Sequence, residues 1–383
     1  MNFNLAPEQK LLDDSLARLL ADHYSFEHRK AHSAGPDGWS RDIWARFAGL
    51  GILGLPFAEE DGGFGGSAVD TMLVMQGLGR SLVVEPYLAT AVLAGGALRH
   101  AGTAAQKREM VPAIAAGEMT AAFAYLEPQS RYDALDVATT ARREGDDWVL
   151  HGRKCVVLHG DSADRLVVSA RVEGGRRDRE GIGLFLVGGQ AEGVSRRGYP
   201  TQDGLRGADL SLDGVRLPAS AAMGEPGACA DLIEQVLDEA AAAVAAEAVG
   251  AMEVLTSMTL DYIKTREQFG RPIGKFQVLQ HRAADMYIAL EQARSMALFA
   301  TLNAGSADAV QRRRAVAAAQ VQTGRSARYV GQQAVQLHGG IGMTMEYAGG
   351  HYFKRLTMIE SLFGDADHHL ARLTLLGGIG SDW

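Results

Sequence analysis

Residues 262–277 read Tyr262-Ile263-Lys264-Thr265-Arg266-Glu267-Gln268-Phe269-Gly270-Arg271-Pro272-Ile273-Gly274-Lys275-Phe276-Gln277. An Ala-rich segment with a helical pattern precedes Arg266, and Gly270 and Pro272 then interrupt that pattern. The segment therefore predicts a long helix that ends near Arg266, a turn, and a second helix that begins near Phe276. An arginine at such a corner can bind a phosphate through two guanidinium nitrogens, although a solvated arginine in a surface loop gives the same sequence.

A second segment carries paired glycines and reads Gln336-Leu337-His338-Gly339-Gly340-Ile341-Gly342-Met343. Paired glycines after a helix let the backbone approach a ligand closely, or they simply end the helix. They follow a helical run rather than a strand, which excludes the glycine turn of a Rossmann domain. Gly274-Lys275-Phe276 lacks the upstream glycine and the Ser/Thr of a phosphate-binding loop. Neither the glycine pair at 339–340 nor the Gly274-Lys275-Phe276 stretch is therefore evidence for binding of NAD or ATP.

Hydrophobic periodicity divides the chain into three parts and predicts an α+β fold that is mostly α. Residues 1–119 and 226–383 have the spacing of helices, whereas residues 120–225 contain short β-type runs separated by turn residues. We expect an N-terminal helical domain, a small middle β-barrel or sandwich with antiparallel strands, and a C-terminal four-helix bundle that contacts other subunits. The strands do not alternate with helices, which excludes a doubly wound sheet. The bundle helices are predicted at Ala230–Thr265, Gln277–Asn303, Asp308–Leu337 and His351–Leu362.

Composition narrows the class of protein. The 38 Lys and Arg residues against 46 Asp and Glu residues give a net charge of −8, which argues against nucleic acid as the main partner. No apolar run approaches the roughly 20 residues of a membrane helix. Cys155 and Cys229 are too few for a disulfide framework. The N-terminus has neither the basic start nor the apolar run of a signal peptide, so we expect a cytoplasmic protein.

The two segments, their separation and the three-part chain resemble the acyl-CoA dehydrogenase family of flavoproteins. The resemblance covers essentially the whole chain, and its most specific part is the Arg-x-Gln-Phe-Gly-x-Pro-Ile-x-x-Phe-Gln stretch at 266–277. Phe3-x-Leu5-x-x-Glu8-Gln9 and Leu53-Gly54-Leu55-Pro56 with Gly62-Gly63 fit as well. Within the family, the chain is most similar to the small-subunit type of pimeloyl-CoA dehydrogenase, through residues 248–264 and the Phe363-Gly364-Asp365 loop.

This resemblance implies FAD as cofactor, an acyl-CoA thioester as substrate and an electron-transferring flavoprotein as electron acceptor. Arg266 and Phe269 would reach the FAD pyrophosphate and adenosine of a neighbouring subunit, and Gln277 belongs to the same cofactor segment. Gln336, Gly339 and Gly340 would line the same dinucleotide from the other side. A site that spans two chains implies at least a dimer, as a homotetramer or as a heterotetramer with a related dehydrogenase chain.

The elements that would face the flavin depart from the family pattern. The family has Thr-Glu-Pro where this chain has Leu126-Glu127-Pro128, so Leu126 offers no hydroxyl to the ring. The family's aromatic-Ile-Thr/Ser run corresponds to Val156-Val157-Leu158, and Leu158 again lacks a hydroxyl. Backbone groups of both segments could still bond the ring edge. We therefore expect flavin binding with altered redox tuning.

Both usual positions of the catalytic base lack a carboxylate. In the family a Glu removes the α-proton while the β-hydrogen leaves as hydride to the flavin. Gly364 stands at its usual loop position, and Ala240 at its alternative helix position. The candidate substitutes are Asp365, Glu247 and Glu239.

Each substitute has a weakness that the sequence makes visible. Asp365 follows the loop position by one residue and also reads as the N-cap of a helix. Glu239 points about 100° away from residue 240, and Glu247 lies roughly 10 Å further along the same face. A helix start also explains Asp365, Asp367, His368 and His369, so no metal site is expected.

Three functions therefore stay open. The first is an FAD-dependent acyl-CoA dehydrogenase. The second is a partner subunit without a base in a heteromeric dehydrogenase, and the third is a flavin-dependent monooxygenase on the same scaffold. The missing Glu favours the last two equally, whereas the nearly complete FAD segments favour the first over the second. No local motif identifies the acyl chain, and Arg131, Arg142 and Arg143 are weak candidates for binding the nucleotide of CoA.

Overall fold

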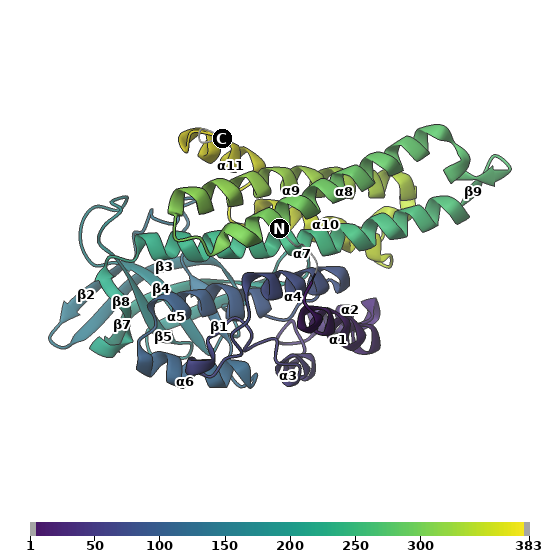
Figure 1. Ribbon diagram of the computed structural model, residues 1–383. Coiled ribbons are helices and arrows are strands. Elements are labelled where there is room, and N and C mark those ends of the chain that lie inside the picture. The colour runs from purple at the N-terminus through teal and green to yellow at the C-terminus, as the bar shows by residue number, and fades with distance from the viewer. Residues whose placement is uncertain (1–4, 379–383) are drawn as a thin grey trace. The chain divides into compact units, whose positions relative to one another are not determined.

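The computed structural model describes residues 5–378 and has the predicted order of helices, strands and helices (Figure 1). The N-terminal helices are α1 (Pro7–His23), α2 (Phe26–Ala34), α3 (Arg41–Gly49), α4 (Ala68–Ser81), α5 (Gly95–Ala101) and α6 (Ala104–Ala115). The sheet strands are β1 (Ala121–Ala124), β2 (Thr140–Glu144), β3 (Asp147–Leu158), β4 (Arg165–Arg171), β5 (Ile182–Gly188), β6 (Val194–Pro200), β7 (Arg206–Pro218) and β8 (Ala222–Gly227). The remaining elements are α7 (Ala230–Thr265), β9 (Glu267–Gln268), β10 (Arg271–Pro272), α8 (Gln277–Ala304), α9 (Ala309–His338), α10 (Ala348–Ser361) and α11 (Ala366–Leu375).

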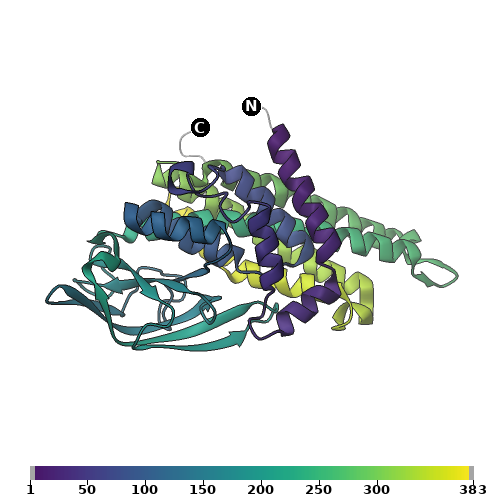
Figure 2. The ribbon, with the colours of Figure 1, turned by 90° about the horizontal axis from the view of Figure 1, so that it is seen from below.

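Contacts group the described residues into two compact units. The first unit contains residues 5–30, 68–83 and 241–378, and the second contains residues 31–67 and 84–240. The first is helical, and the second holds all the strands of the large sheet (Figure 2). The three-domain boundaries expected after residues 119 and 225 stay a prediction.

The middle strands form one sheet in the order β6-β7-β3-β2-β4-β5-β8, and β1 pairs with β4 outside this path. Most neighbouring strands are antiparallel, as predicted, but the expectation of an antiparallel sheet is wrong at β4, which pairs in parallel with β1 and, through Thr140 and Arg171, with β2. Because no tight turn joins β1 to β4, hairpin geometry does not set their relative direction. The sheet buries an apolar cluster in which the rings of Trp148 and Phe185 lie edge to face at 5.1 Å.

The bundle of the first unit packs small residues at the helix contacts. Ala241 and Ala242 of α7 lie against Ala300 and Ala304 of α8 and against α9. The side chain of Gln320 on α9 donates to the Ala241 carbonyl at 2.7 Å. Alanines allow these long helices to approach closely while they retain a high helix propensity.

Glycines allow α4 and α7 to cross in the first unit. A Cβ atom on Gly250 would lie 2.0 Å from the Gln76 carbonyl oxygen, and one on Gly79 would lie 2.1 Å from the Glu247 carbonyl oxygen. Neither backbone can move aside at such distances, so both positions require glycine. Beside this crossing, Glu253 of α7 accepts hydrogen bonds from Gln76 at 2.8 Å and from Arg80 at 2.7 Å. The contacts hold the two helices in one register.

Helix α7 corrects one expectation from the sequence. Ala230–Thr265 is long and apolar enough by length and composition to cross a membrane, and it is one such helix among the residues 5–378. The expectation that no apolar segment approaches that length is therefore wrong. However, 78% of its apolar window is buried inside the protein, which is the condition of a core helix.

Candidate functional site

The corner after α7 is a two-residue hairpin that carries exposed side chains. Strands β9 and β10 pair Gln268 with Arg271, and the intervening Phe269 and Gly270 have φ values of 56° and 77°. Positive φ at both central residues is typical of the tight turn that joins twisted antiparallel strands. Phe269 is 90% exposed, and no ion pair involving Arg266 is found in residues 5–378. The predicted turn is thus present and presents an aromatic ring and a guanidinium to solvent.

The glycine pair at the end of α9 is open on its outer side. Gly339 has a φ of 65°, and a Cβ atom on Gly339 or Gly340 would have no atom within 4 Å. The Gly339 amide donates to the Gln336 carbonyl and ends the helix. An accessible backbone of this kind beside a positive charge fits the phosphates of a dinucleotide.

A buried histidine joins the glycine pair to the corner, which the sequence did not reveal. The ring of His338 lies 4.6 Å from that of Tyr262 on α7, and its Nε2 lies 2.8 Å from the Tyr347 hydroxyl. Tyr262 in turn accepts the Arg266 amide hydrogen bond at its carbonyl. Since His338 precedes Gly339 directly, these contacts bring together the two segments that lie about seventy residues apart in the sequence. Gln277 and Gln336 are exposed near the ends of α8 and α9.

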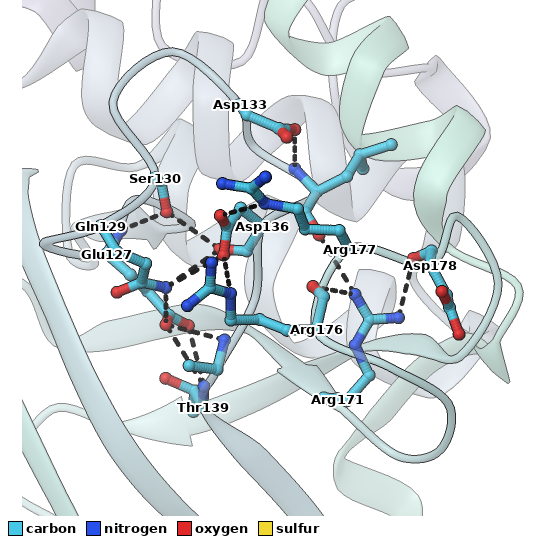
Figure 3. Close-up of polar contacts among 12 residues, drawn as sticks. Glu127, Gln129, Ser130, Asp133, Asp136, Thr139, Arg171, Arg176, Arg177 and Asp178 are labelled. Carbon is cyan, nitrogen blue, oxygen red and sulfur yellow. Dashed lines mark hydrogen bonds and ion pairs between the residues drawn. The ribbon is translucent and has the colours of Figure 1, made fainter.

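Leu126 and Leu158 belong to the second unit, where their segments lie side by side. The Cys155 amide donates to the Leu126 carbonyl at 2.9 Å, and both leucines are half-buried. Glu127 anchors the segment after Leu126: its carboxylate accepts from the Thr139 amide at 3.0 Å and from the Gln129 side chain at 2.9 Å (Figure 3). Burial alone would raise the pKa of Glu127, but the adjacent Lys154 ammonium and these hydrogen bonds lower it to about 2.

Arginines fix the loops beside Glu127. Arg176 and Arg177 bind the two oxygens of the buried Asp136 carboxylate, at 2.8 and 2.9 Å (Figure 3). Arg171 donates to the carbonyls of Asp178 at 2.8 Å and of Leu135 at 3.1 Å. The cluster closes the β4–β5 loop against the segment after β1, and its arginines are committed to these contacts.

Asp365 caps α11, as one of its two sequence interpretations predicts. Its Oδ1 accepts the His368 amide hydrogen bond at 2.8 Å, and the side chain is half-buried. Gly364 before it has a φ of 118°, and a Cβ atom there would lie 2.5 Å from His368 Cδ2 and 2.8 Å from His369 Nε2. The loop position of the base therefore holds glycine for both backbone and steric reasons.

The two glutamates on α7 are held by cations. Glu247 binds Arg355 of α10 through both oxygens, at 2.6 and 2.7 Å, and both side chains are buried. Glu239 accepts from Arg99 at 2.6 Å and lies 2.7 Å from His100 Nε2. Burial opposes ionisation of Glu239, but His100 and Arg99 hold its pKa below the ordinary value. Ala240 is fully buried, as a residue facing the core would be.

His369 is a buried titratable group beside Gly364. Burial, together with His368 and Arg372, lowers the pKa of His369 from 6.5 to about 3, while Asp365 and the Phe363 backbone oppose this lowering. The ring is therefore neutral at pH 7. In the unfolded chain the same ring takes up a proton near pH 6.5.

Stability should fall in acid because of His369. Between about pH 6.5 and about pH 3 the unfolded chain binds this proton and the folded chain does not, so acid favours unfolding. From pH 7 to pH 5 the free energy of unfolding should drop by about 2 kcal/mol on account of this group, at about 1.4 kcal/mol per pH unit. Urea unfolding of the wild type and His369→Leu at both pH values measures the difference. Equal pH dependence in the two proteins would contradict the assignment.

Two cavities contain none of the residues predicted to bind FAD or to act as the base, although Arg143, a candidate for binding the nucleotide of CoA, lines the second. A cavity of about 300 Å³ in the first unit is lined by residues of α1, α4, α7 and α8, including Gln76 and Arg294. Another of about 600 Å³ in the second unit lies beside α6 and the β8 edge. Within residues 5–378 no group of His, Cys, Asp or Glu side chains could hold a metal ion.

The comparisons with known proteins cover most of the chain. The family models "Acyl-CoA dehydrogenase, N-terminal domain", "middle domain" and "C-terminal domain" match residues 6–118, 122–215 and 230–374. The acyl-CoA dehydrogenase FadE12 of Mycobacterium tuberculosis is 30% identical over 359 residues, which are 90% of this chain and 89% of FadE12.

Two solved structures are similar over nearly the full length. A variant of the Tcur3481-Tcur3483 steroid ACAD has a TM-score of 0.86 at 30% identity, covering 96% of this chain and 97% of that chain. The ChsE4-ChsE5 complex from Mycobacterium tuberculosis has a TM-score of 0.88 at 25% identity, covering 100% of both chains.

Proposed function

Because the chain belongs to the acyl-CoA dehydrogenase family, we propose that it catalyses the α,β-dehydrogenation of an acyl-CoA thioester and passes electrons to an electron-transferring flavoprotein. It is an oxidoreductase, and its cofactor is FAD. When bound, FAD supplies the acceptor for the β-hydrogen, which leaves the substrate as hydride. The chain must then hold the dinucleotide and take up the α-proton.

The observation that carries this proposal is the Arg266 corner held beside the Gly339–Gly340 pair by Tyr262 and His338. The exposed guanidinium suits a pyrophosphate, the open backbone allows close approach, and the Phe269 ring suits an adenine face. Gln277 and Gln336 stand at the ends of the helices that flank this corner.

We assign the base to Asp365. Arg355 binds both oxygens of Glu247, and Arg99 and His100 hold Glu239, so neither glutamate is suited to accept a proton. A carboxylate at the start of α11 is one residue from the usual position of the base and can take the α-proton there.

A second candidate is a partner subunit that completes the FAD site of a related chain and carries no base. The fit of Gly364 against His368 and His369 favours it, because that loop leaves no room for a glutamate. The similar ChsE4-ChsE5 complex contains two named components, and the pimeloyl-CoA dehydrogenase small-subunit type that we propose here would belong to such a two-component enzyme. Tyr287, Ile288 and Leu302 expose apolar area on α8, as expected of a helix in a tetramer. We expect this assembly in the cytoplasm.

Anaerobic titration of the FAD-loaded protein with a panel of acyl-CoA esters tests the proposal. We expect one class of ester to bleach the visible flavin band, because the substrate then reduces the cofactor. A panel of fatty, branched, dicarboxylic and steroid side-chain esters also identifies the acyl chain. If FAD binds but no ester bleaches it, the dehydrogenase proposal fails for the chain alone, and copurification with a related chain then tests the second candidate.

A further inference from the structure

Lys154 and Glu127 form an ion pair inside the second unit. Lys154 Nζ donates to Glu127 Oε1 at 2.7 Å and to Ser169 Oγ at 2.9 Å, and the two charged side chains are 0% and 3% exposed. Burial lowers the pKa of Lys154, and Glu127 opposes this lowering. A buried pair of this kind is weak as a source of stability, so a role in fixing one conformation should be considered.

The pair joins two segments of backbone that lie next to each other. Glu127 directly follows Leu126, and Lys154 directly precedes Cys155, whose amide donates to the Leu126 carbonyl. The Glu127 carboxylate also accepts from the Ala138 amide at 2.9 Å and from the Thr139 amide (Figure 3). The Glu127 carboxylate thus holds its own segment after β1 to the backbone just before β2 and, through the Lys154 side chain, to β3.

The backbone of β3 is distorted immediately after Lys154. Lys154 pairs with Leu210 and Val157 with Ala208, so two residues of β3 stand opposite one residue of β7. Val156 in this bulge has a φ of 50°, which is costly for a β-branched residue. The bulge persists because the surrounding contacts hold it, among them the Val156 amide, which bonds to the Asp209 carboxylate. Bulges and strained residues of this kind recur beside functional sites.

We propose that Lys154 and Glu127 are positioning residues for the flavin: they hold the bulge and the Leu126 segment, and thereby the backbone groups of Leu126 and Leu158 that meet the ring edge. The inference rests on the proposed function and on the family resemblance, by which the Leu126 and Leu158 segments would face the ring. Since neither leucine has a hydroxyl, backbone amides are the donors that this face can offer. Donors at the ring edge favour the more negatively charged reduced state, so loosening the backbone lowers the reduction potential.

Lys154→Met tests the role because it removes the ammonium and keeps a long, unbranched side chain. We expect the variant to bind FAD and to lower the midpoint potential of the bound flavin by at least about 30 mV. For a two-electron couple this is a tenfold shift of the equilibrium between oxidised and reduced flavin towards the oxidised form. The midpoint potential, measured with reference dyes, and the visible circular dichroism of the flavin report this change without turnover. Glu127→Gln should cause a smaller shift of the same sign, since the amide retains one acceptor oxygen.

Gln106→Met is the matched control for a structural role alone. Gln106 is buried in the same unit and donates to the Ser220 and Ala222 carbonyls, with no contact to the bulge. It should lower the melting temperature and leave the flavin potential unchanged.

The outcomes separate the inference from the proposed function. If Lys154→Met and Glu127→Gln keep the wild-type potential and flavin spectrum, the pair is only structural and the inference is overturned. If Lys154→Met does not fold, the Glu127→Gln potential decides alone. A wild-type chain that binds no FAD would overturn the proposed function and the inference together. If acyl-CoA bleaches the flavin of the wild type but the variants keep the wild-type flavin potential, only the inference is overturned.

Discussion

Replacing Asp365 by Asn is expected to slow flavin reduction by the acyl-CoA substrate by about 10²–10⁴-fold, the usual contribution of a general base. The amide is nearly isosteric and keeps an oxygen that can accept the His368 amide hydrogen bond, so α11 should retain its N-cap. The loss therefore reports proton transfer rather than folding. Anaerobic stopped-flow mixing of the FAD-loaded variant with the bleaching ester gives the rate directly.

Asp367→Asn is the control for Asp365→Asn. Asp367 is an exposed carboxylate in the first turn of the same helix, so its removal changes the local charge equally. In Asp367→Asn, the ester should reduce the flavin at the wild-type rate. If the flavin of Asp365→Asn is also reduced at the wild-type rate, Asp365 is not the base, and the base belongs to another residue or to a partner chain.

Breaking the buried pair between α7 and α10 should have the largest effect on stability. Arg355→Met leaves the Glu247 carboxylate buried without its bidentate partner, and the side chains are 5% and 6% exposed in the pair. Removing one member of a buried ion pair typically costs about 3–5 kcal/mol. Urea unfolding, followed by far-ultraviolet circular dichroism, measures the change in the free energy of unfolding.

Two further variants test the cause of this loss. The double variant Arg355→Met with Glu247→Gln removes both charges and should recover most of the lost stability. Arg46→Met removes an exposed pair with Asp42 on α3 and should cost less than about 1 kcal/mol. A loss in Arg355→Met as small as that in Arg46→Met would show that the pair does not stabilise the fold, and Glu247 would again be a candidate base.

Local sequence signals predicted the helical part of the fold closely. The predicted helices Gln277–Asn303 and Asp308–Leu337 correspond to α8 and α9 within about one residue, because Asp308 caps α9 and glycines follow both helices. The turn at Gly270 was visible for the same reason. The parallel pairing of β1 with β4 was not, since it depends on contacts between strands far apart in the chain.

The sequence identified residues of the candidate site but not the ion pairs that hold its carboxylates. Asp365 was recognised as both a possible base and an N-cap, and the N-cap bond is present. The partners of Glu247 and Glu239 lie 108 and 140 residues away in the sequence, and no periodicity indicates such contacts. The ion pair of Lys154 with Glu127 was not visible in the sequence either, because the alternation of side chains along a strand does not show which charged residue is buried beside a partner.

The apolar length of α7 has a consequence for synthesis of the chain. Its residues from Ala241 onward pack against α8 and α9, yet the ribosome makes α7 first and completes α9 at His338, 73 residues after Thr265. At about 5–20 residues per second this interval lasts about 4–15 s. During it, the emerging helix is without α9 and exposes a face that resembles a membrane segment to chaperones and targeting factors. Rapid translation of residues 266–338 would therefore favour a high yield of folded protein.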